Sequence, residues 1–447
     1  MVRNILMNNK IVRYIATFIV VCDLLYVSYI QISNFNDKNS ESLINIKVGI
    51  DIKNDNYPII SSQDDEEEGI STNFSEYISK FRKRPKDGYI IDYEKIVSHC
   101  DMSKFLAEQC LEYLDKNESN YIIPNPDLNQ KDSLKCSPDQ PPMLFHVFWK
   151  GDISDKISLM IKSFLFTQPL QCSKLYIWLD DTTMTLEDNP YSYSLLQFSP
   201  KYIEFKNWNT EEQLNYDPIY KGWEYNLNKK RRSVSFSDMV RFVVLQRYGG
   251  IYVDADVLLL RDLSQFYHTN FEFSYQWSFK EDYNTAVLRL RPNSTTTRMI
   301  IEGAMNNRMR FHPFSIKNYF TSVENPTKDD VNPYLYMLPV PLFDPLWLKK
   351  DRRQRNSTLT PNINVWYDVF NPELSLNEFV NVDPENATPQ LRKVDGFFPG
   401  AFTYHWHNNW RTEILPTSWM GILRSAYDEF LSGQQPNIYN EYLSLIM

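Results

Sequence analysis

The sequence lacks an excess of positive charge, with 47 lysines and arginines against 56 aspartates and glutamates and a formal net charge of −9. This balance argues against a general nucleic-acid-binding protein, whose binding face would be basic. Part of the acidity is the single run Asp64–Glu68, so it says little about a substrate. The chain also lacks an internal repeat. Its apolar and aromatic fractions, 43% and 15%, are nevertheless those of a globular protein.

Cysteine is scarce as well, with five in 447 residues. Cys22 lies in an apolar segment, and the other four are Cys100, Cys110, Cys136 and Cys172. Their spacings do not resemble a zinc site. An even number of cysteines in an oxidising compartment predicts two disulfides, with three pairings left open, and free buried thiols are the alternative.

One apolar run near the N-terminus, Tyr14–Ile32, is nearly long enough to span a bilayer. Basic residues precede it and acidic residues follow it. The positive-inside rule therefore predicts a cytosolic tail at residues 1–13, a transmembrane signal anchor at 14–32 and the bulk of the chain on the far side of the membrane. Asp23 counts against this prediction, because a carboxylate within the span costs about 2.5–3.5 kcal/mol. A cleaved signal peptide and a buried core helix are the alternatives.

The composition after the apolar run fits a lumenal glycoprotein. Residues 33–138 are expected to form a lumenal stem and accessory segment, because the part from Ser33 to about Arg84 is polar and has little apolar periodicity. Within residues 94–113 the spacing is helix-like. Five Asn-x-Ser/Thr sequons occur along the chain, at Asn73, Asn117, Asn293, Asn356 and Asn386.

Residues 139–447 are expected to form one large domain, starting with a dense alternation of strand-like and helix-like segments. Strands are predicted at Met143–Gly151, Lys174–Asp181, Lys201–Trp208 and Gly250–Leu260, and helices at Ser154–Phe166 and Ser237–Tyr248. Ser237 is the expected N-cap of the second helix, and Gly249 lies just past its end. This alternation predicts an α/β fold with a mostly parallel sheet, whose ligands bind at the carboxyl ends of the strands.

Two acids, Asp254 and Asp256, follow one of these buried strands at its carboxyl end. Residues i and i+2 of a strand point to the same side, so two carboxylates here would repel each other unless a cation lies beside them. Hard divalent ions such as Mg²⁺ or Mn²⁺ prefer oxygen ligands and are commonly shared with phosphates. The pair alone is a weak signal, because Asp-x-Asp also arises in loops.

The helix before this strand carries Asp238 and Arg241, which share a face because they are three residues apart. The rest of this helix is apolar, so both charges need partners. An ion pair within the helix is one interpretation. The other is a site in which Arg241 contacts phosphate or sugar oxygens and Asp238 accepts hydrogen bonds from sugar hydroxyls.

The run "SFSDMVRFVVLQRYGGIYVDADVLL" resembles the DXD-containing sugar transferases of glycosyltransferase family 32. Its relatives include initiating α-1,6-mannosyltransferases, inositolphosphoceramide mannosyltransferases and α-1,4-galactosyltransferases. The shared elements are Ser-Asp-x-x-Arg, Tyr-Gly-Gly-Ile-Tyr and Asp-x-Asp. "FHVFWKG" at 145–151 is similar to the first strand of that family, where a His-x-x-Trp-x-Gly pattern lies near the nucleotide base. The likeness extends over about residues 141–291 and loosely over the C-terminal "YHWHNNW".

The resemblance implies a GT-A type fold, a nucleotide-sugar donor, a divalent metal (Mn²⁺ or Mg²⁺) and transfer with retention of configuration. By position it implies that Asp256 ligates the metal and that Asp254 contacts the ribose or a metal-bound water, with Tyr252 beside it. Asp238 and Arg241 would hold the donor sugar.

Other residues are assigned through the same resemblance. Phe148 and Trp149 would border the base, and Asn284 would lie near the donor. The family tends to close the metal site with a C-terminal histidine, for which this chain offers His405 and His407, two of its six histidines. They lie on one side if the segment is extended. We favour His405 and leave His407 open.

The resemblance therefore implies an enzyme that moves a hexose from GDP-mannose or a UDP-hexose to a glycan or glycolipid acceptor. It would be a single-pass type II protein of the Golgi or ER membrane with its catalytic domain in the lumen. A catalytically silent carbohydrate-binding or scaffolding relative of the same fold is the alternative. No nucleic-acid partner is expected.

Overall fold

The structure is a computed structural model. It describes residues 82–101, 107–126, 141–223, 233–269, 271–278, 280, 282–320, 334–347, 366–371 and 397–446. All of them belong to one unit, Ser71–Met447. The apolar segment Tyr14–Ile32, Cys136 and the sequons at Asn73, Asn356 and Asn386 lie outside the described residues. Within the described ranges, no helix has both the length and the apolar character needed to cross a membrane.

A seven-stranded mixed sheet forms the centre of this unit. The strands are ordered β10-β8-β9-β6-β3-β4-β5, and among them β9 runs antiparallel to both of its neighbours while the other pairs are parallel. Their bounds are β3 Met143–Lys150, β4 Ser173–Asp180, β5 Ile203–Asn207, β6 Gly250–Val253, β8 Phe273–Gln276, β9 Tyr283–Leu290 and β10 Tyr336–Leu338. The parallel-rich sheet confirms the predicted α/β class and fits the GT-A arrangement that the resemblance implies.

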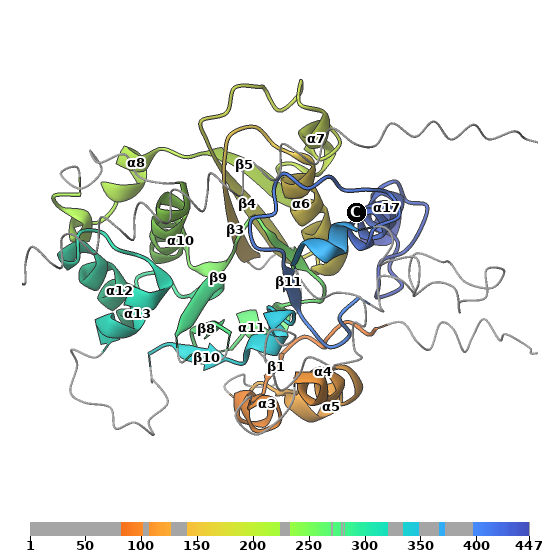
Figure 1. Ribbon diagram of the computed structural model, residues 1–447, viewed down its shortest axis with the longest axis horizontal. Coiled ribbons are helices and arrows are strands. Elements are labelled where there is room, and N and C mark those ends of the chain that lie inside the picture. The colour runs from red at the N-terminus through yellow and green to blue at the C-terminus, as the bar shows by residue number, and fades with distance from the viewer. Residues whose placement is uncertain are drawn as a thin grey trace, which may run out of the picture. The chain divides into compact units, whose positions relative to one another are not determined.

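Helices cover both faces of the sheet. In Figure 1, α6 and α17 lie on one side of it, and α10, α12 and α13 lie on the other. Side chains of β3 pack into the hydrophobic core on both faces of the sheet. Phe145 and Val147 belong to the core with α6, whereas Phe148 belongs to the core with α10. Burying one such side chain contributes about 1.5–3 kcal/mol. The helix bounds are α6 Asp155–Thr167, α7 Pro190–Tyr193, α8 Thr210–Leu214, α10 Ser233–Tyr248, α11 Ser264–Tyr267, α12 Thr295–Asn306, α13 Pro313–Phe320, α17 Trp419–Leu431 and α18 Leu443–Ile446.

The direction in which successive strands are added to the sheet reverses between β3 and β6. From β3 the chain passes through α6 to β4 and on to β5 in one direction, and it then returns through α10 to place β6 on the other side of β3. In open α/β sheets, ligands bind outside the carboxyl ends of the strands at such a switch point. The ligand site is therefore expected among the residues that follow β3 and β6.

Helix α10 and the two glycines after it set the entry into β6. The helix begins at Ser233, four residues before the predicted N-cap Ser237, so the prediction of Ser237 as N-cap is wrong. Its predicted end is confirmed, because Gly249 has φ +65° and its N–H donates to Leu245 O. Gly250 has φ +108°, and a Cβ there would lie 2.3 Å from Leu144 O. Neither position tolerates a larger residue.

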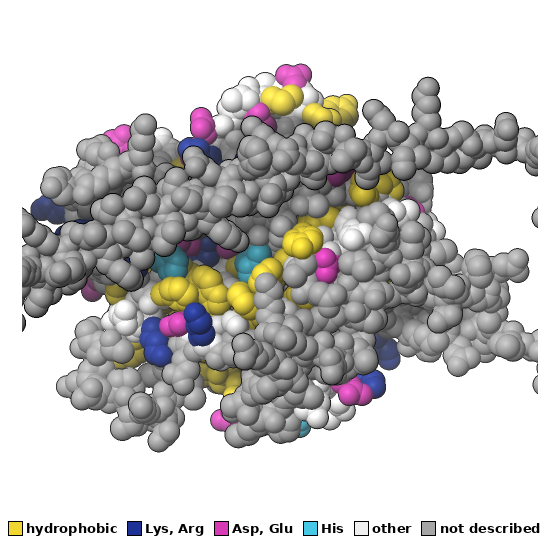
Figure 2. All heavy atoms as spheres, viewed as in Figure 1, with side chains coloured by type: hydrophobic (Ala, Val, Ile, Leu, Met, Phe, Trp, Pro, Cys, Tyr) yellow, Lys and Arg dark blue, Asp and Glu magenta, His cyan; other side chains and the backbone are white. Residues whose placement is uncertain are grey.

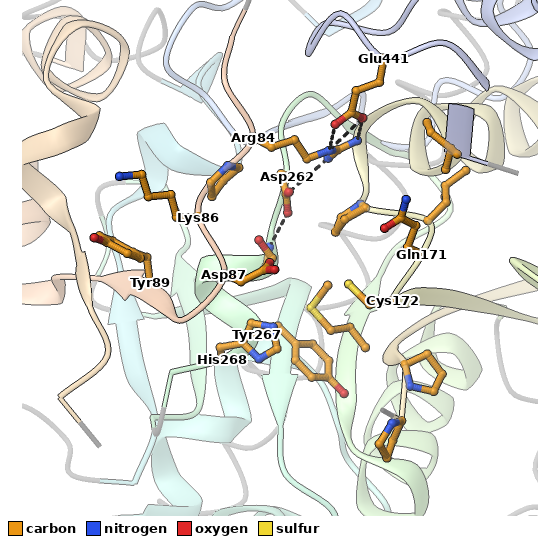
Figure 3. A pocket seen from close by; sticks show the side chains of 18 residues that line it. Arg84, Lys86, Asp87, Tyr89, Gln171, Cys172, Asp262, Tyr267, His268 and Glu441 are labelled. Carbon is orange, nitrogen blue, oxygen red and sulfur yellow. Dashed lines mark hydrogen bonds and ion pairs between the residues drawn. The ribbon is translucent and has the colours of Figure 1, made fainter. Parts of the chain in front are cut away.

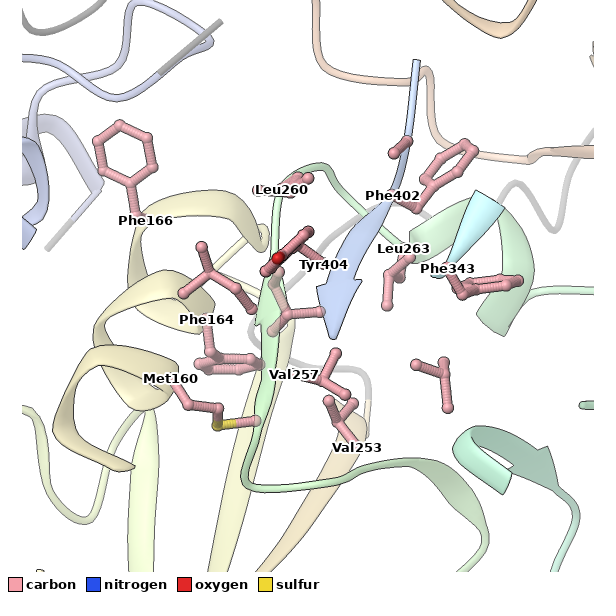
Figure 4. Close-up of a cluster of buried hydrophobic side chains, with 14 of the residues drawn as sticks. Met160, Phe164, Phe166, Val253, Val257, Leu260, Leu263, Phe343, Phe402 and Tyr404 are labelled. Atoms are coloured by element: carbon pink, nitrogen blue, oxygen red, sulfur yellow. The ribbon is translucent and has the colours of Figure 1, made fainter. Parts of the chain in front are cut away.

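The predicted strand 250–260 is interrupted. Its first part is β6, and after a turn at residues 254–256 the chain forms β7, Val257–Leu259. Strand β7 leaves the large sheet and pairs antiparallel with β11, Thr403–His405. Figure 4 shows Met160 and Phe164 of α6 on one side of β7, and Tyr404 belongs to β11, the second strand of this ribbon. The ribbon carries the C-terminal histidines to the end of β6.

The segment before the sheet is built into the same core. It contains β1 Tyr89–Ile91, α3 Tyr93–Cys100, α4 Ala107–Lys116, α5 Glu118–Tyr121 and β2 Ile122–Pro124. The helix-like spacing over 94–113 therefore corresponds to two helices, which a Cys100–Cys110 disulfide joins. Cys172 is also disulfide-bonded. Arg84 anchors the start of this segment through ion pairs with Asp262 and Glu441.

Candidate active site

A cavity of about 380 Å³ lies at the carboxyl ends of β3 and β6. Nine of the ten site residues expected from the sequence line it, namely Phe148, Trp149, Asp238, Arg241, Asp254, Asp256, Asn284, His405 and His407. The tenth, Tyr252, is buried directly beneath it, with its ring 5.2 Å from the Arg241 guanidinium carbon. In Figure 2, histidine side chains lie next to hydrophobic and charged ones near the middle of the face shown.

One half of the site is a charge cluster around Arg241. Its Nη2 lies 2.9 Å from Asp254 Oδ1 and 3.1 Å from Asp238 Oδ1. The side chains of Arg241 and Asp238 are almost fully buried. The i, i+3 ion pair considered from the sequence is therefore present, but Arg241 also binds the first acid of the DXD pair. We name this trio the arginine cluster.

Burial governs the charges in the arginine cluster. Burial and, to a smaller degree, the charge of nearby Asp256 raise the pKa of Asp254 to about 7 against the opposing effect of Arg241. Burial also raises the pKa of Asp238, again opposed by Arg241. Arg241 itself keeps its proton, because its two acidic neighbours outweigh the desolvation that would lower its pKa.

The other half of the site gathers Asp256, Asp344, His405 and His407, which we name the histidine cluster. His405 Nε2 lies 3.2 Å from Asp256 Oδ2, and His407 Nε2 lies 2.8 Å from Asp344 Oδ2. His405 Nδ1 faces Asp344 at 3.6 Å. The two imidazole rings are stacked with centroids 3.8 Å apart. The backbone N–H of Asn408 donates to Asp256 Oδ2.

In the histidine cluster, the attraction between opposite charges outweighs the effect of burial on the pKa values of Asp256 and His405. Burial would raise the pKa of Asp256, but His405 and the Asn408 hydrogen bond lower it to about 2. Burial would lower the pKa of His405, but its interactions with Asp256 and Asp344 raise it to about 10. For His407, burial prevails and lowers the pKa in spite of Asp344. Carboxylates that stay ionised beside imidazoles are suited to a cation.

The histidine cluster has the donor set and the spacing of a metal site. One ligand atom each from Asp344, His405 and His407 lies within 4.8 Å of the others. Among the described residues, the buried Asp344 Oδ1 has no hydrogen-bond partner. A buried carboxylate oxygen left unpaired costs about 1–3 kcal/mol or more, which a bound cation would offset. The residues present therefore fit a divalent ion such as Mn²⁺.

Sequence reasoning missed Asp344. It stands as the single acid in the run "PLFDPLW" at 341–347, and it is completely buried. A lone acid inside an apolar stretch is the same kind of signal that singled out Asp254 and Asp256. Its partner His407 is 63 residues away, so only the fold reveals what the acid is for.

Two geometric expectations need correction. Asp254 and Asp256 lie in the turn after β6 and not in a strand, and they face different partners, Arg241 and His405. His405 ends β11, and His407 adopts φ +50°. The two histidines therefore come together through a tight turn and not through an extended segment.

The aromatic wall of the cavity comes from the end of β3. Phe148 packs against Phe236 and Trp208, while Trp149 packs against Trp410 with ring centroids 4.6 Å apart. Across the cavity, Asn284 at the start of β9 uses its Oδ1 to accept a hydrogen bond from the backbone N–H of Ala286. Within the part of the chain that the structure describes, the Asn284 side-chain NH₂ is the group that remains for a ligand.

The histidine of the His-x-x-Trp-x-Gly pattern, His146, is a core residue. It is fully buried, its Nε2 bonds Gly249 O at 2.8 Å and its Nδ1 accepts from Trp178 Nε1. Burial lowers its pKa to about 4 against the opposing effect of the Gly249 hydrogen bond, and the positive charge of Lys206 contributes to this lowering. The family pattern at this position thus tethers β3 to the turn before β6.

A second cavity, of about 680 Å³, lies at the opposite ends of the strands, where β3 and β4 begin. Figure 3 shows Arg84 in it, bonded to Glu441 and Asp262. The guanidinium also donates to the backbone carbonyls of Thr167 and Gln168. The Arg84 guanidinium in this second cavity is thus already bound by groups of the protein. Ligands of such sheets also bind at the carboxyl ends of parallel strands and not at their amino ends.

Comparison with known proteins supports the class of DXD-containing glycosyltransferases. Residues 164–272, less than half of the chain, match the family model described as "Glycosyltransferase sugar-binding region containing DXD motif". The matched region includes the arginine cluster and Asp256, but not Asp344 or the C-terminal histidines. No curated protein matches the chain.

Solved structures similar to the chain are distant. The PaToxG glycosyltransferase is 15% identical with a TM-score of 0.30, covering 51% of this chain and 80% of that one. The glycosyltransferase GlyE of Streptococcus pneumoniae TIGR4 is 12% identical with a TM-score of 0.33, covering 65% of this chain and 64% of that one. The galactosyltransferase LgtC, solved with donor and acceptor sugar analogs, is 15% identical with a TM-score of 0.26 and covers 40% and 70%.

Proposed function

We propose that this protein is a metal-dependent glycosyltransferase that moves a hexose from a nucleotide sugar, GDP-mannose or a UDP-hexose, to a glycan or glycolipid acceptor with retention of configuration. The observation that carries the proposal is the joining of the arginine cluster and the histidine cluster in one cavity at the switch point of the sheet. The DXD family match over residues 164–272 supports the reaction class.

Asp256, His405, His407 and Asp344 would hold Mn²⁺ or Mg²⁺, and Asp254 lies beside them. When bound, the ion would neutralise the charge that develops on the leaving nucleoside diphosphate. The protein's own groups would position the donor. Phe148 and Trp149 offer aromatic faces for the base.

The arginine cluster would hold the donor sugar. Asp238 would accept hydrogen bonds from sugar hydroxyls, because Arg241 holds its carboxylate at the cavity wall. Arg241 also fixes Asp254 in one orientation, which removes a rotational freedom that substrate binding would otherwise have to restrict. Retention would follow same-face substitution, in which the leaving phosphate helps to take the acceptor's proton. This last element rests on the family resemblance.

We further propose that the chain is a single-pass type II protein of the Golgi or ER membrane, anchored by Tyr14–Ile32. The motivation is the charge difference across that apolar run. Expression in eukaryotic cells should yield endoglycosidase-sensitive glycans. A sugar-free cytosolic product would contradict this topology.

The direct test of activity is a screen of nucleotide sugars with the purified full-length chain, measuring donor hydrolysis with and without Mn²⁺. We expect Mn²⁺-dependent release of UDP or GDP from one donor. Binding of a nucleotide without turnover of any donor would favour the catalytically silent relative.

A further inference from the structure

A second aromatic group borders the active-site cavity on the side away from Phe148. Trp277, which directly follows β8, and His312, which precedes α13, both line this cavity. In the sheet, β8 and β3 lie on opposite sides of β6. The acids after β6 therefore stand between two aromatic walls, one from β3 and one from the β8 side.

The rings on the β8 side form a connected shelf. The centroids of Trp277 and Phe314 are 4.7 Å apart, and those of His312 and Phe314 are 5.0 Å apart. Trp277 and His312 are nearly parallel, with an interplanar angle of 25°. Phe314 is 41% exposed, and Trp277 and His312 are partly exposed. Exposed apolar side chains that are scattered singly are common, but connected rings beside a cavity are a feature of ligand-binding grooves.

The shelf has polar neighbours, which favours a ligand that is apolar on one face and polar at its edges. His312 lies close enough to Asp238 for their charges to interact. Lys280 places its ammonium 5.3 Å from the Phe314 ring centre. A hexose ring has this mixed character, because its C–H face can pack on the negative face of an aromatic ring while its hydroxyls bond to surrounding charged groups.

We propose that Trp277, His312 and Phe314 form the acceptor platform, on which a sugar ring of the acceptor stacks. The proposal rests on the proposed function. If the donor base occupies the β3 wall and its phosphates meet the acids after β6, the transferred sugar points toward the β8 side. The acceptor hydroxyl has to approach it there. An acyl chain would instead favour an aliphatic wall without charged neighbours.

The test measures saccharide binding directly. Methyl glycosides of glucose, galactose, mannose and N-acetylglucosamine are titrated into the full-length chain and followed by saturation-transfer NMR. We expect at least one to bind, and we expect Trp277→Ala to weaken its binding about 10-fold. Trp277→Phe should recover part of the affinity, because it restores a ring face. Tyr193→Ala removes an aromatic side chain that is 67% exposed and lies outside the cavity lining, so it should leave binding unchanged.

The outcomes separate the platform from the proposed reaction. Glycoside binding that does not depend on Trp277 in a folded variant, or no glycoside binding at all, overturns the platform. If wild-type protein binds glycosides through Trp277 but hydrolyses no nucleotide sugar, the rings are a saccharide-binding surface, and both the proposed reaction and the acceptor role are refuted. Thermal melting of each variant verifies the fold. Should Trp277→Ala fail to fold, Phe314→Ala, at an exposed position, provides the same comparison.

Discussion

The arginine cluster and the histidine cluster use two acids that are two residues apart in opposite ways. Asp254 is bound by Arg241, which also binds Asp238, so each of these two carboxylates has a side-chain cation as its partner. Asp256 faces His405 in a group where Asp344 still has an unpaired buried oxygen. The difference teaches that the first acid is held by a fixed side-chain cation, whereas the second belongs to a group of carboxylates and imidazoles that is suited to a metal cation.

The largest effect is expected from Asp256→Asn, which removes the ionised oxygen that faces His405. We expect Mn²⁺-dependent donor turnover to fall at least about 10³-fold, because several kcal/mol of charge stabilisation are lost. Donor hydrolysis measures this effect, and circular dichroism verifies the fold. Asp428→Asn is the matched charge control, because Asp428 is an exposed acid of α17 that pairs with Lys162 and lies outside the cavity lining. Wild-type turnover in Asp256→Asn would refute a role for Asp256 at the metal.

Arg241→Met tests how much the ion pairs of the arginine cluster contribute to stability. It leaves Asp238 and Asp254 buried without their cation, so we expect the free energy of unfolding in urea to fall by about 3–5 kcal/mol. Arg247→Met, on the same helix, removes a cation paired with the exposed Glu212, and it should change stability by less than about 1 kcal/mol. Equal effects in the two variants would show that the cluster has no special stability.

His405→Gln and His407→Gln compare the two candidate ligands. His405 presents Nε2 to Asp256, whereas Nε2 of His407 is taken by Asp344. We therefore expect His405→Gln to weaken Mn²⁺ binding about 100-fold and His407→Gln about 10-fold. Titration followed by the electron paramagnetic resonance of free Mn²⁺ gives both affinities. The opposite order would transfer the main ligand role to His407.

Asp344→Asn tests the acid that the sequence did not reveal. Whether Asp344 binds the ion or orients the imidazoles, losing its charge should weaken Mn²⁺ binding about 10-fold, since outer partners of metal ligands contribute 10- to 100-fold. The same resonance titration applies, again with Asp428→Asn as control. An unchanged affinity would remove Asp344 from the metal centre.

His146 provides the reference for a buried histidine outside both clusters. Its folded-state pKa of about 4 lies below the ordinary value of 6.5. The unfolded chain therefore takes up a proton first as the pH falls, and the folded state loses stability below pH 6.5. We expect a loss of about 1 kcal/mol between pH 7 and pH 5.7. Urea unfolding at both values measures it, and His146→Gln should reduce this difference. An equal pH dependence in that variant would exclude His146 as its source.

Much of the fold and part of the site could be predicted because their signals are local. The runs at 143–151 and 154–166 have the periodicities of a buried strand and a helix, and they form β3 and α6. Predictions failed where tertiary contacts override local pattern. The apolar stretch 250–260 reads as one strand, but β7 leaves the sheet to pair with β11, which no local signal encodes.

The sequence by itself determined the tight entry into β6 and the acids that follow it. Gly249 and Gly250 adopt backbone angles that other residues resist, and the strand after them delivers Asp254 and Asp256 to the sheet edge. Only the tertiary structure decided which partner each acid has. The register of β7 with β11 places His405 opposite Val257, next to Asp256. Asp344 comes from a different segment and lies 3.6 Å from His405 Nδ1 and 2.8 Å from His407 Nε2. Such contacts join residues far apart in the chain, so only the packing of the whole domain brings them together.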